Sequence, residues 1–269
     1  MSGRRRVDLI GMPTDVHSSF MRGPALAPPL IRAALFSPHG NAASERGVEF
    51  GAEIDLHNCG DLPLAEAPRD DELIEAAVMR SLKAGAAPIS LGGDHSITYP
   101  ILRAIAAHHG PVDILHFDAH PDLYHDYGGD RRSHASPFAR IMEEGLASRL
   151  MQVGIRTLEK HQREQAARFG VEIMEMKDFV RAQLPAFDKP LYISIDLDAF
   201  DPAFAPGVSH HEPGGLTARE VINILLDLKV PLLGADVVEY NPTRDLNGIT
   251  AILAAKLVTE LASLASTRR

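Results

Sequence analysis

Acidic and histidine side chains alternate directly after an apolar run in this 269-residue chain. The run is Val112 to Phe117, and Asp118, His120 and Asp122 follow it. Because successive side chains of extended backbone point to opposite sides, a spacing of two directs all three polar groups to one side. Carboxylate and imidazole groups on one face can bind a metal ion, so the segment is a candidate metal site.

Two further strand-like runs end in groups of the same kind. Asp196 and Asp198 follow the run Leu191 to Ile195, and His95 follows Pro88 to Leu91 in the segment GGDHS. One such residue at a strand end often only caps a helix or accepts a hydrogen bond, but three motifs together favour a metal centre. Five or six oxygen and nitrogen ligands without sulfur suit Mn²⁺ better than Zn²⁺ and exceed the needs of one ion. We therefore expect a binuclear manganese site.

Three polar residues close to these motifs are predicted to have supporting or structural roles. Asp94 precedes His95 and is a candidate for orienting a metal ligand. His116 and His125 are expected to be ordinary strand and loop histidines, because no interaction partner for either of them can be identified from the sequence.

The apolar runs before the motifs fit the strands of a parallel sheet. Several are apolar on both faces and alternate with stretches of helical period, which predicts right-handed βαβ units, and ligands gather beyond the carboxyl ends of such strands. Thr217 and Glu220 match a capping box at one helix start. The expected strands are Val7 to Gly11, Glu53 to Leu56, Pro88 to Leu91, Val112 to Phe117, Met151 to Ile155, Val171 to Met174, Leu191 to Ile195 and Leu232 to Val238. The expected helices are Asp70 to Gly85, Tyr99 to His109, Pro137 to Glu144, Lys160 to Phe169, Thr217 to Leu228 and a last helix with an apolar stripe through Ile249, Leu253, Leu257 and Leu261.

Composition limits the class of protein. The net charge of −9 disfavours nucleic-acid binding, and 45% hydrophobic with 23% charged residues indicates a globular α/β protein that we expect to form one domain over residues 1–269. Cys59 is the only cysteine, which excludes an intrachain disulfide and a cysteine-ligated zinc or iron–sulfur site. No apolar run approaches the roughly 18 residues of a membrane span. We expect a cytoplasmic protein without a membrane partner, with an organelle matrix as the alternative.

Five segments resemble the signatures of the ureohydrolase (arginase/agmatinase) family, in family order and spacing. They are LGGDHSITYP, ILHFDAHPDLY, SHASPFARI, YISIDLDAFDPAFAPGVSHHEPGGL and GADVVEYNP. The segments SHAS and APGVSH most resemble the corresponding segments of the plant-type arginases. The resemblance implies a three-layer, doubly wound α/β fold with a mainly parallel eight-stranded sheet, two Mn²⁺ ions per chain, and a homotrimer or homohexamer.

The resemblance also assigns chemical roles to residues of this chain. It makes His134 the proton-shuttling histidine and Glu239 the acid that binds a guanidinium. Two metal ions generate hydroxide at neutral pH, a histidine can protonate an amine leaving group, and a carboxylate matches a planar guanidinium. The six residues assigned to the two ions, with their partition left open, are His95, Asp118, His120, Asp122, Asp196 and Asp198.

Three further residues are expected at the substrate. Ser133 belongs to the SHAS segment, and the resemblance places Glu159 where it would meet an amino group of the substrate. The chain has SHHE at 209–212, where many agmatinases carry Gly-Thr-Pro, so His210 is expected to lie near the metals and contact substrate.

Two arginines are candidates for binding a substrate carboxylate. Arg131 and Arg132 lie in the polar, glycine-containing segment 126–133, which is predicted to be a loop over the pocket. An arginine fork suits a carboxylate. The alternative is that both side chains are simply solvated.

The leading functional hypothesis is hydrolysis of L-arginine to L-ornithine and urea. An agmatinase or a guanidino-acid hydrolase is the alternative within the family, and a zinc deacetylase of related architecture is more remote, because it has no need of His95 and the second pair of aspartates. From another class, a metal-binding scaffold without turnover would predict a missing ligand or a missing His134, and neither is missing.

Overall fold

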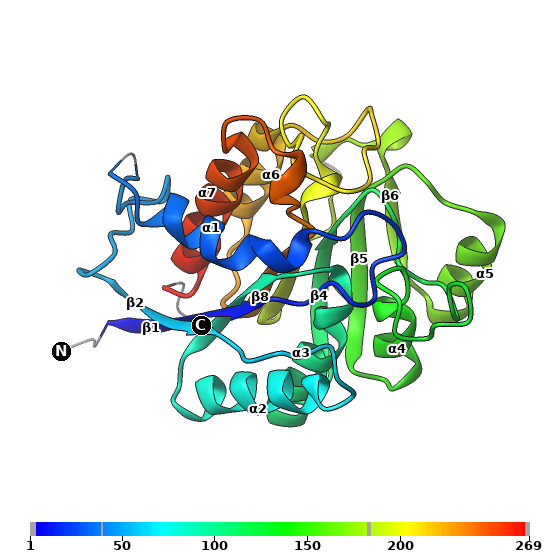
Figure 1. Cartoon of the computed structure of the whole chain (residues 1–269), viewed down its shortest axis with the longest axis horizontal. Coiled ribbons are helices and arrows are strands. Elements are labelled where there is room, and N and C mark those ends of the chain that lie inside the picture. The colour runs from blue at the N-terminus through cyan, green and yellow to red at the C-terminus, as the bar shows by residue number, and fades with distance from the viewer. Residues whose placement is uncertain (1–3, 39, 182–183, 267–269) are drawn as a thin grey trace.

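The computed structural model describes residues 4–38, 40–181 and 184–266 and is built on one eight-stranded sheet (Figure 1). The strand order is β2-β1-β3-β8-β7-β4-β5-β6, and every paired neighbour is parallel. The sheet expected from the sequence is therefore confirmed. Its strands are β1 (Arg5–Met12), β2 (Ile54–Asp61), β3 (Ala87–Gly92), β4 (Val112–Phe117), β5 (Ala147–Ile155), β6 (Glu172–Glu175), β7 (Leu191–Asp196) and β8 (Leu232–Val238).

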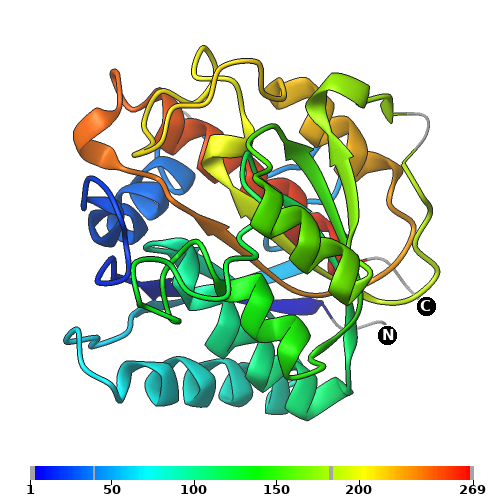
Figure 2. The ribbon, with the colours of Figure 1, turned by 90° about the vertical axis from the view of Figure 1, so that its right-hand side faces the viewer.

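Helices cover the sheet on both faces and make the three expected layers. Helices α1, α6 and α7 share one apolar cluster, and α2 to α5 share the other. Figures 1 and 2 show α2 and α3 on one side of β1, with α1 and α7 on the opposite side. The helices are α1 (Ala27–Leu35), α2 (Asp70–Lys83), α3 (Thr98–His109), α4 (Pro137–Glu143), α5 (Lys160–Phe169), α6 (Ala218–Asp227) and α7 (Ile249–Leu264).

The strand β1 illustrates why an apolar run on both faces indicates a buried parallel strand. Val7 and Leu9 join the cluster beneath α1, α6 and α7, whereas Ile10 and Met12 join the cluster beneath α2 to α5. Alternate side chains of one strand thus enter two different cores, as expected for a sheet covered on both faces.

Helix α1 is the one α-helix of the described residues that the sequence did not predict. Its sequence APPLIRAAL has prolines at the second and third positions, which discourage a helix prediction but are acceptable in the first turn, where the backbone N–H groups have no helical partner. Ile31 is fully buried, and the helix packs against α7. Tertiary packing therefore decides this element.

The sheet order brings together the strand ends that carry the candidate site. Strands β3, β8, β7 and β4 are consecutive neighbours, although they are distant in the sequence. Because they run parallel, the segments that follow them leave the same edge of the sheet.

Among the described helices, none is long and apolar enough to cross a membrane.

The predicted capping box at the start of α6 is present. Glu220 N–H donates to Thr217 Oγ1 at 3.1 Å, and Thr217 N–H donates to the Glu220 carboxylate at 2.8 Å. Replacing Thr217 with Ala is expected to lower the free energy of unfolding by about 1 kcal/mol, because one N–H at the helix start loses its acceptor. Denaturant unfolding at fixed protein concentration measures the change. Thr217→Ser keeps the hydroxyl and should retain the parent stability; equal losses in both variants would contradict the capping role.

Candidate active site

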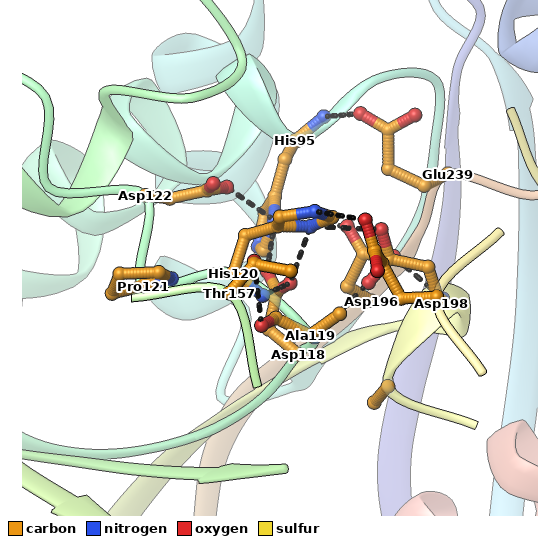
Figure 3. A network of polar contacts seen from close by, with 12 residues as sticks. His95, Asp118, Ala119, His120, Pro121, Asp122, Thr157, Asp196, Asp198 and Glu239 are labelled. Carbon is orange, nitrogen blue, oxygen red and sulfur yellow. Dashed lines mark hydrogen bonds and ion pairs between the residues drawn. The ribbon is translucent and has the colours of Figure 1, made fainter. Parts of the chain in front are cut away.

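The structure brings the six predicted metal-binding side chains together at one edge of the sheet. His95 begins the short helix η2 (His95–Ile97) after β3, and Asp118 directly follows β4. Asp196 ends β7, and Asp198 lies in the short helix η5 (Leu197–Ala199). Figure 3 shows the acidic side chains converging on His95 and His120. All of these groups except the His120 ring are almost completely buried.

Three carboxylates surround one nitrogen of His95. His95 Nδ1 lies 3.2 Å from Asp118 Oδ2, 3.0 Å from Asp122 Oδ2 and 3.2 Å from Asp196 Oδ2. Two ligand atoms bound at right angles to one octahedral ion, each about 2.1 Å from it, lie about 3 Å apart. The observed separations therefore match atoms that share an ion.

The second imidazole, His120, contacts a related pair of carboxylates. Its Nδ1 lies 3.1 Å from Asp198 Oδ2 and 3.4 Å from Asp118 Oδ1. Asp118 thus presents one oxygen to each histidine, as a carboxylate between two ions would. The other nitrogen of His120 faces Glu212 at 3.8 Å, an acidic partner that the sequence analysis did not predict.

The hydrogen bonds of His95 leave a lone pair directed at the carboxylates. Tyr192 and Ser194 hydroxyls donate to Asp236, so the Ser194 oxygen is free to accept from His95 Nε2–H at 2.9 Å. In the neutral imidazole, Nδ1 is then the unprotonated nitrogen, and this buried atom has no hydrogen-bond partner. A lone pair facing three carboxylates is repulsive unless a cation lies among them, so the donor set fits a bound metal ion.

The raised pKa values of two of the acids also indicate that positive charge would stabilise the cluster. Burial and the neighbouring Asp118 raise the pKa of Asp122 to about 7. Burial, followed by repulsion from Asp198, raises the pKa of Asp196 well above its ordinary value. Because crowded buried carboxylates resist ionisation, this arrangement favours either protons or a cation.

Asp118 is oriented by His116, for which the sequence analysis found no partner. His116 Nε2 lies 2.9 Å from Asp118 Oδ2, and Gln152 donates to His116 Nδ1 at 3.0 Å. The spacing of two along β4 was the available signal, because it places both side chains on one face. His125 is an exposed loop histidine, as predicted.

Glu239 and His134 form a second group at the edge of the cluster. Glu239 follows β8 with φ 63°, a strained conformation for a residue with a side chain, and Oε1 accepts the His95 backbone N–H at 2.9 Å. The same oxygen lies 2.8 Å from His134 Nδ1. Burial opposes the charging of His134, but Glu239 raises the pKa of the imidazole to about 9. The buried pair is therefore carboxylate and imidazolium at neutral pH.

A cavity of about 170 Å³ opens beside both groups. It includes the predicted residues Glu159 and His210 and several residues that the sequence analysis missed. Their only signal was proximity in the sequence to segments that resemble the family, which for Ser19 is the segment SSFMRGPALAPPLIR near the N-terminus. The missed lining residues are Ser19, Tyr124, Tyr127, Ala135, Thr157 and Gln162.

Three predicted substrate-binding residues do not line this cavity. Arg131 pairs with Glu143 at 2.9 Å, and Arg132 forms a two-pronged contact with Asp71 at 2.6 and 2.9 Å. Ser133 is buried, and its hydroxyl accepts a hydrogen bond from Ala135 N–H. The structure therefore does not support the expected carboxylate-binding role of the two arginines, because acidic residues of α2 and α4 already pair with their guanidinium groups.

Asp94 also differs from its predicted role. It accepts hydrogen bonds from Ser96 N–H at 3.0 Å and from His17 N–H at 3.0 Å, and is fully buried. Asp94 therefore anchors the segment 17–19 beside the cavity instead of holding a metal ligand.

Comparisons with known proteins agree with this fold. The model of the arginase family matches residues 5–263. Arginase 1 of Arabidopsis thaliana, named as mitochondrial, is 50% identical over 95% of this chain and 80% of its own length. The human guanidino acid hydrolase, also named as mitochondrial, is 37% identical over 94% of this chain and 76% of its own length.

A solved structure gives the same result in three dimensions. The arginase from Medicago truncatula superposes with a TM-score of 0.93 and 46% identity, covering 97% of this chain and 87% of that one. The fold and the buried His/Asp cluster thus define an α/β protein with a metal centre at the edge of a parallel sheet. The chain belongs to the arginase family.

Asp118→Asn is expected to lower the metal bound per chain, because Asp118 contacts both metal-facing histidines. Elemental analysis after dialysis against Mn²⁺ measures the ratio. Asp113→Asn changes a buried acid at the other end of β4 and is the matched control. Retention of the parent metal content by Asp118→Asn would show that the carboxylate is not a ligand.

Removal of the metal is expected to lower Tm. An ion bound only by the folded chain adds RT ln(1 + [L]/Kd), about 2.7 kcal/mol at a free concentration of 100 Kd. Thermal unfolding with and without a chelator measures the effect, which should be much smaller in Asp118→Asn. An unchanged Tm in the parent protein contradicts the prediction.

Proposed function

We propose that this chain hydrolyses L-arginine to L-ornithine and urea. The observation that carries the choice of substrate is the 50% identity to the Arabidopsis thaliana arginase, against 37% for the human guanidino acid hydrolase. The buried cluster and the Glu239–His134 pair beside one cavity supply the groups that this reaction needs.

Two Mn²⁺ ions are the proposed cofactor. His95 with Asp122 would hold one ion, His120 with Asp198 would hold the other, and Asp118 would serve both. Asp196 completes the ligand set on the side of His95. When bound, such ions supply hydroxide at neutral pH and stabilise negative charge that develops during hydrolysis.

Glu239 is proposed to bind the substrate guanidinium. Burial opposes the ionisation of Glu239, but His134 lowers the pKa of the carboxyl below its ordinary value. The carboxylate lines the cavity and is fixed by the His95 backbone N–H. Because Oε1 already accepts from His95 N–H and His134 Nδ1–H, Oε2 is the oxygen left to accept guanidinium N–H groups and orient the substrate toward the cluster.

His134 is proposed to protonate the leaving amine. Its pKa of about 9 keeps the imidazole protonated at neutral pH. Because Nδ1–H is committed to Glu239, the proton available for transfer is on Nε2. A positioned general acid of this kind avoids expulsion of an unprotonated amine.

Two lining residues are proposed to meet the rest of the substrate. Glu159 lies beside Tyr124, whose pKa is raised to about 12 by burial and by that carboxylate, and can bind an ammonium group. Burial lowers the pKa of His210, so its neutral ring can pack against the aliphatic chain. The ring lies 5.4 Å from that of His134.

Agmatine is the second candidate substrate, on a specific observation. Among the described residues that line the cavity there is no Lys or Arg to pair with an α-carboxylate. Agmatine lacks that group, and either substrate offers a guanidinium to Glu239.

The assembly and compartment are also proposals. One domain over residues 1–269 is proposed, of which 1–3, 39, 182–183 and 267–269 lie outside the described residues. Exposed Leu30 of α1 and Ile252 of α7 support self-association, as a homotrimer or homohexamer. The cytoplasm is the proposed location, with an organelle matrix as the alternative because the relative from Arabidopsis thaliana is named as mitochondrial.

Urea release tests the proposed reaction. The manganese-loaded protein is expected to turn over arginine with a higher kcat/KM than agmatine or guanidinobutyrate, measured on all three at one pH. Faster turnover of agmatine would reverse the order of the two candidates, and no urea from any of them would reject the proposed function.

His134→Asn is expected to lower kcat by about two to four orders of magnitude, because the leaving amine loses its proton donor. Metal content should stay at the parent value, since the His134 ring contacts Glu239 and not the cluster. His161→Asn, which changes an exposed histidine of α5, is the control. A variant with normal kcat would exclude His134 as the acid, and loss of metal would make it a ligand.

The double variant Arg131→Ala/Arg132→Ala is expected to leave the ratio of kcat/KM for arginine and agmatine unchanged. Both guanidinium groups point to acidic partners outside the cavity. Steady-state kinetics on both substrates measures the ratio. A selective loss for arginine would restore the carboxylate-binding hypothesis.

A further inference from the structure

Ser19, in the segment 17–19, faces Nε2 of His134, the nitrogen that carries the proton proposed for transfer. Ser19 Oγ lies 2.8 Å from His134 Nε2, and the Ser19 backbone nitrogen lies 3.1 Å from the same atom. Glu239 meets the opposite nitrogen, Nδ1. The ring is therefore held at both nitrogens, by groups that are distant in the sequence.

The two Ser19 groups match the two states of a proton donor. When Nε2 is protonated, its N–H can donate to Ser19 Oγ. After the proton has left, Nε2 has a lone pair, and Ser19 N–H can donate to it. Nδ1–H continues to donate to Glu239 in both states, so the ring keeps one tautomer and one orientation.

We propose that Ser19 is a positioning residue that holds the His134 imidazole in place both before and after proton transfer. The inference rests on the proposed function, in which His134 protonates the leaving amine. The Ser19 hydroxyl can accept from the protonated ring, and the Ser19 backbone N–H donates to the unprotonated ring. Because Ser19 offers both groups at one point, the ring has no need to rotate during the reaction.

The segment around Ser19 is itself fixed by the backbone. His134 N–H donates to the His17 carbonyl at 3.1 Å, and His17 N–H donates to the buried Asp94. The His17 ring contacts Asp130 at 2.8 Å. These contacts tie the segment 17–19 to the His134 backbone, to Asp94 and to Asp130.

Ser19→Ala tests the hydroxyl while leaving the backbone N–H in place. We expect kcat for urea release by the manganese-loaded enzyme to fall about 10- to 100-fold, the effect of losing one hydrogen bond to a charged group. KM should change much less than kcat, because Glu239 and the other lining residues are intact. An unchanged kcat overturns the proposal.

Two variants separate positioning from loop structure. Ser18→Ala removes the neighbouring hydroxyl, which contacts only Asp94 among the described contacts, at 3.4 Å, and should keep the parent kcat. Ser19→Thr restores a hydroxyl at an exposed position and should recover most of the activity. Equal losses in Ser18→Ala and Ser19→Ala, or no recovery in Ser19→Thr, overturn the proposal.

A measurement without substrate distinguishes this proposal from the proposed function. Diethyl pyrocarbonate modifies accessible imidazole nitrogens, and peptide mass spectrometry reports the rate at His134. Modification should be faster in Ser19→Ala than in the parent or Ser18→Ala, because Nε2 loses its hydroxyl partner. Equal rates overturn the role of Ser19 even where the parent releases no urea, an outcome that would reject the reaction separately.

Discussion

Repulsion among four buried carboxylates is the constraint on which the rest of the site depends. Asp118, Asp122, Asp196 and Asp198 lie within contact distance of two imidazoles, and burial raises the cost of every uncompensated charge. Among the described residues, no arginine or lysine forms an ion pair with these four carboxylates. The protein fixes the positions of the two imidazoles among the acids instead, so that a cation can complete the arrangement and the side chains need little reorganisation to bind it.

The same backbone device presents the acids at three strand ends. Asp94, Asp118 and Asp196 each accept the N–H of the residue two positions later, at 3.0, 2.6 and 2.8 Å. Such turns redirect the chain as a strand ends and fix one carboxylate oxygen. Because β3, β8, β7 and β4 are neighbours, these local turns, together with Glu239 after β8, become one site. The parallel sheet therefore brings acidic groups that are fixed by local turns into one cluster.

The proton-transferring group has a different origin. His134 lies in a loop and is held between Glu239, whose backbone is strained at φ 63°, and Ser19 from the segment after β1. Packing around the carboxyl edge of the sheet maintains that strain. The His/Asp cluster and the His134 ring are thus held by different residues. Substitutions can therefore change one group without the other, and their contributions to catalysis can be measured separately.

The sequence alone determined the parts of this protein that depend on local pattern. Apolar runs on both faces specified the buried strands, a Thr217–Glu220 pair specified a helix start, and alternating acids specified the ligand face after β4, because each is set by neighbours along the chain. Tertiary structure decided what depends on distant partners. Arg132 pairs with Asp71 of α2, outside the cavity, and Ser19 reaches His134 across 115 positions. Contacts between such distant residues leave no periodic pattern in the sequence, because burial and the strand order of the sheet determine which side chains meet.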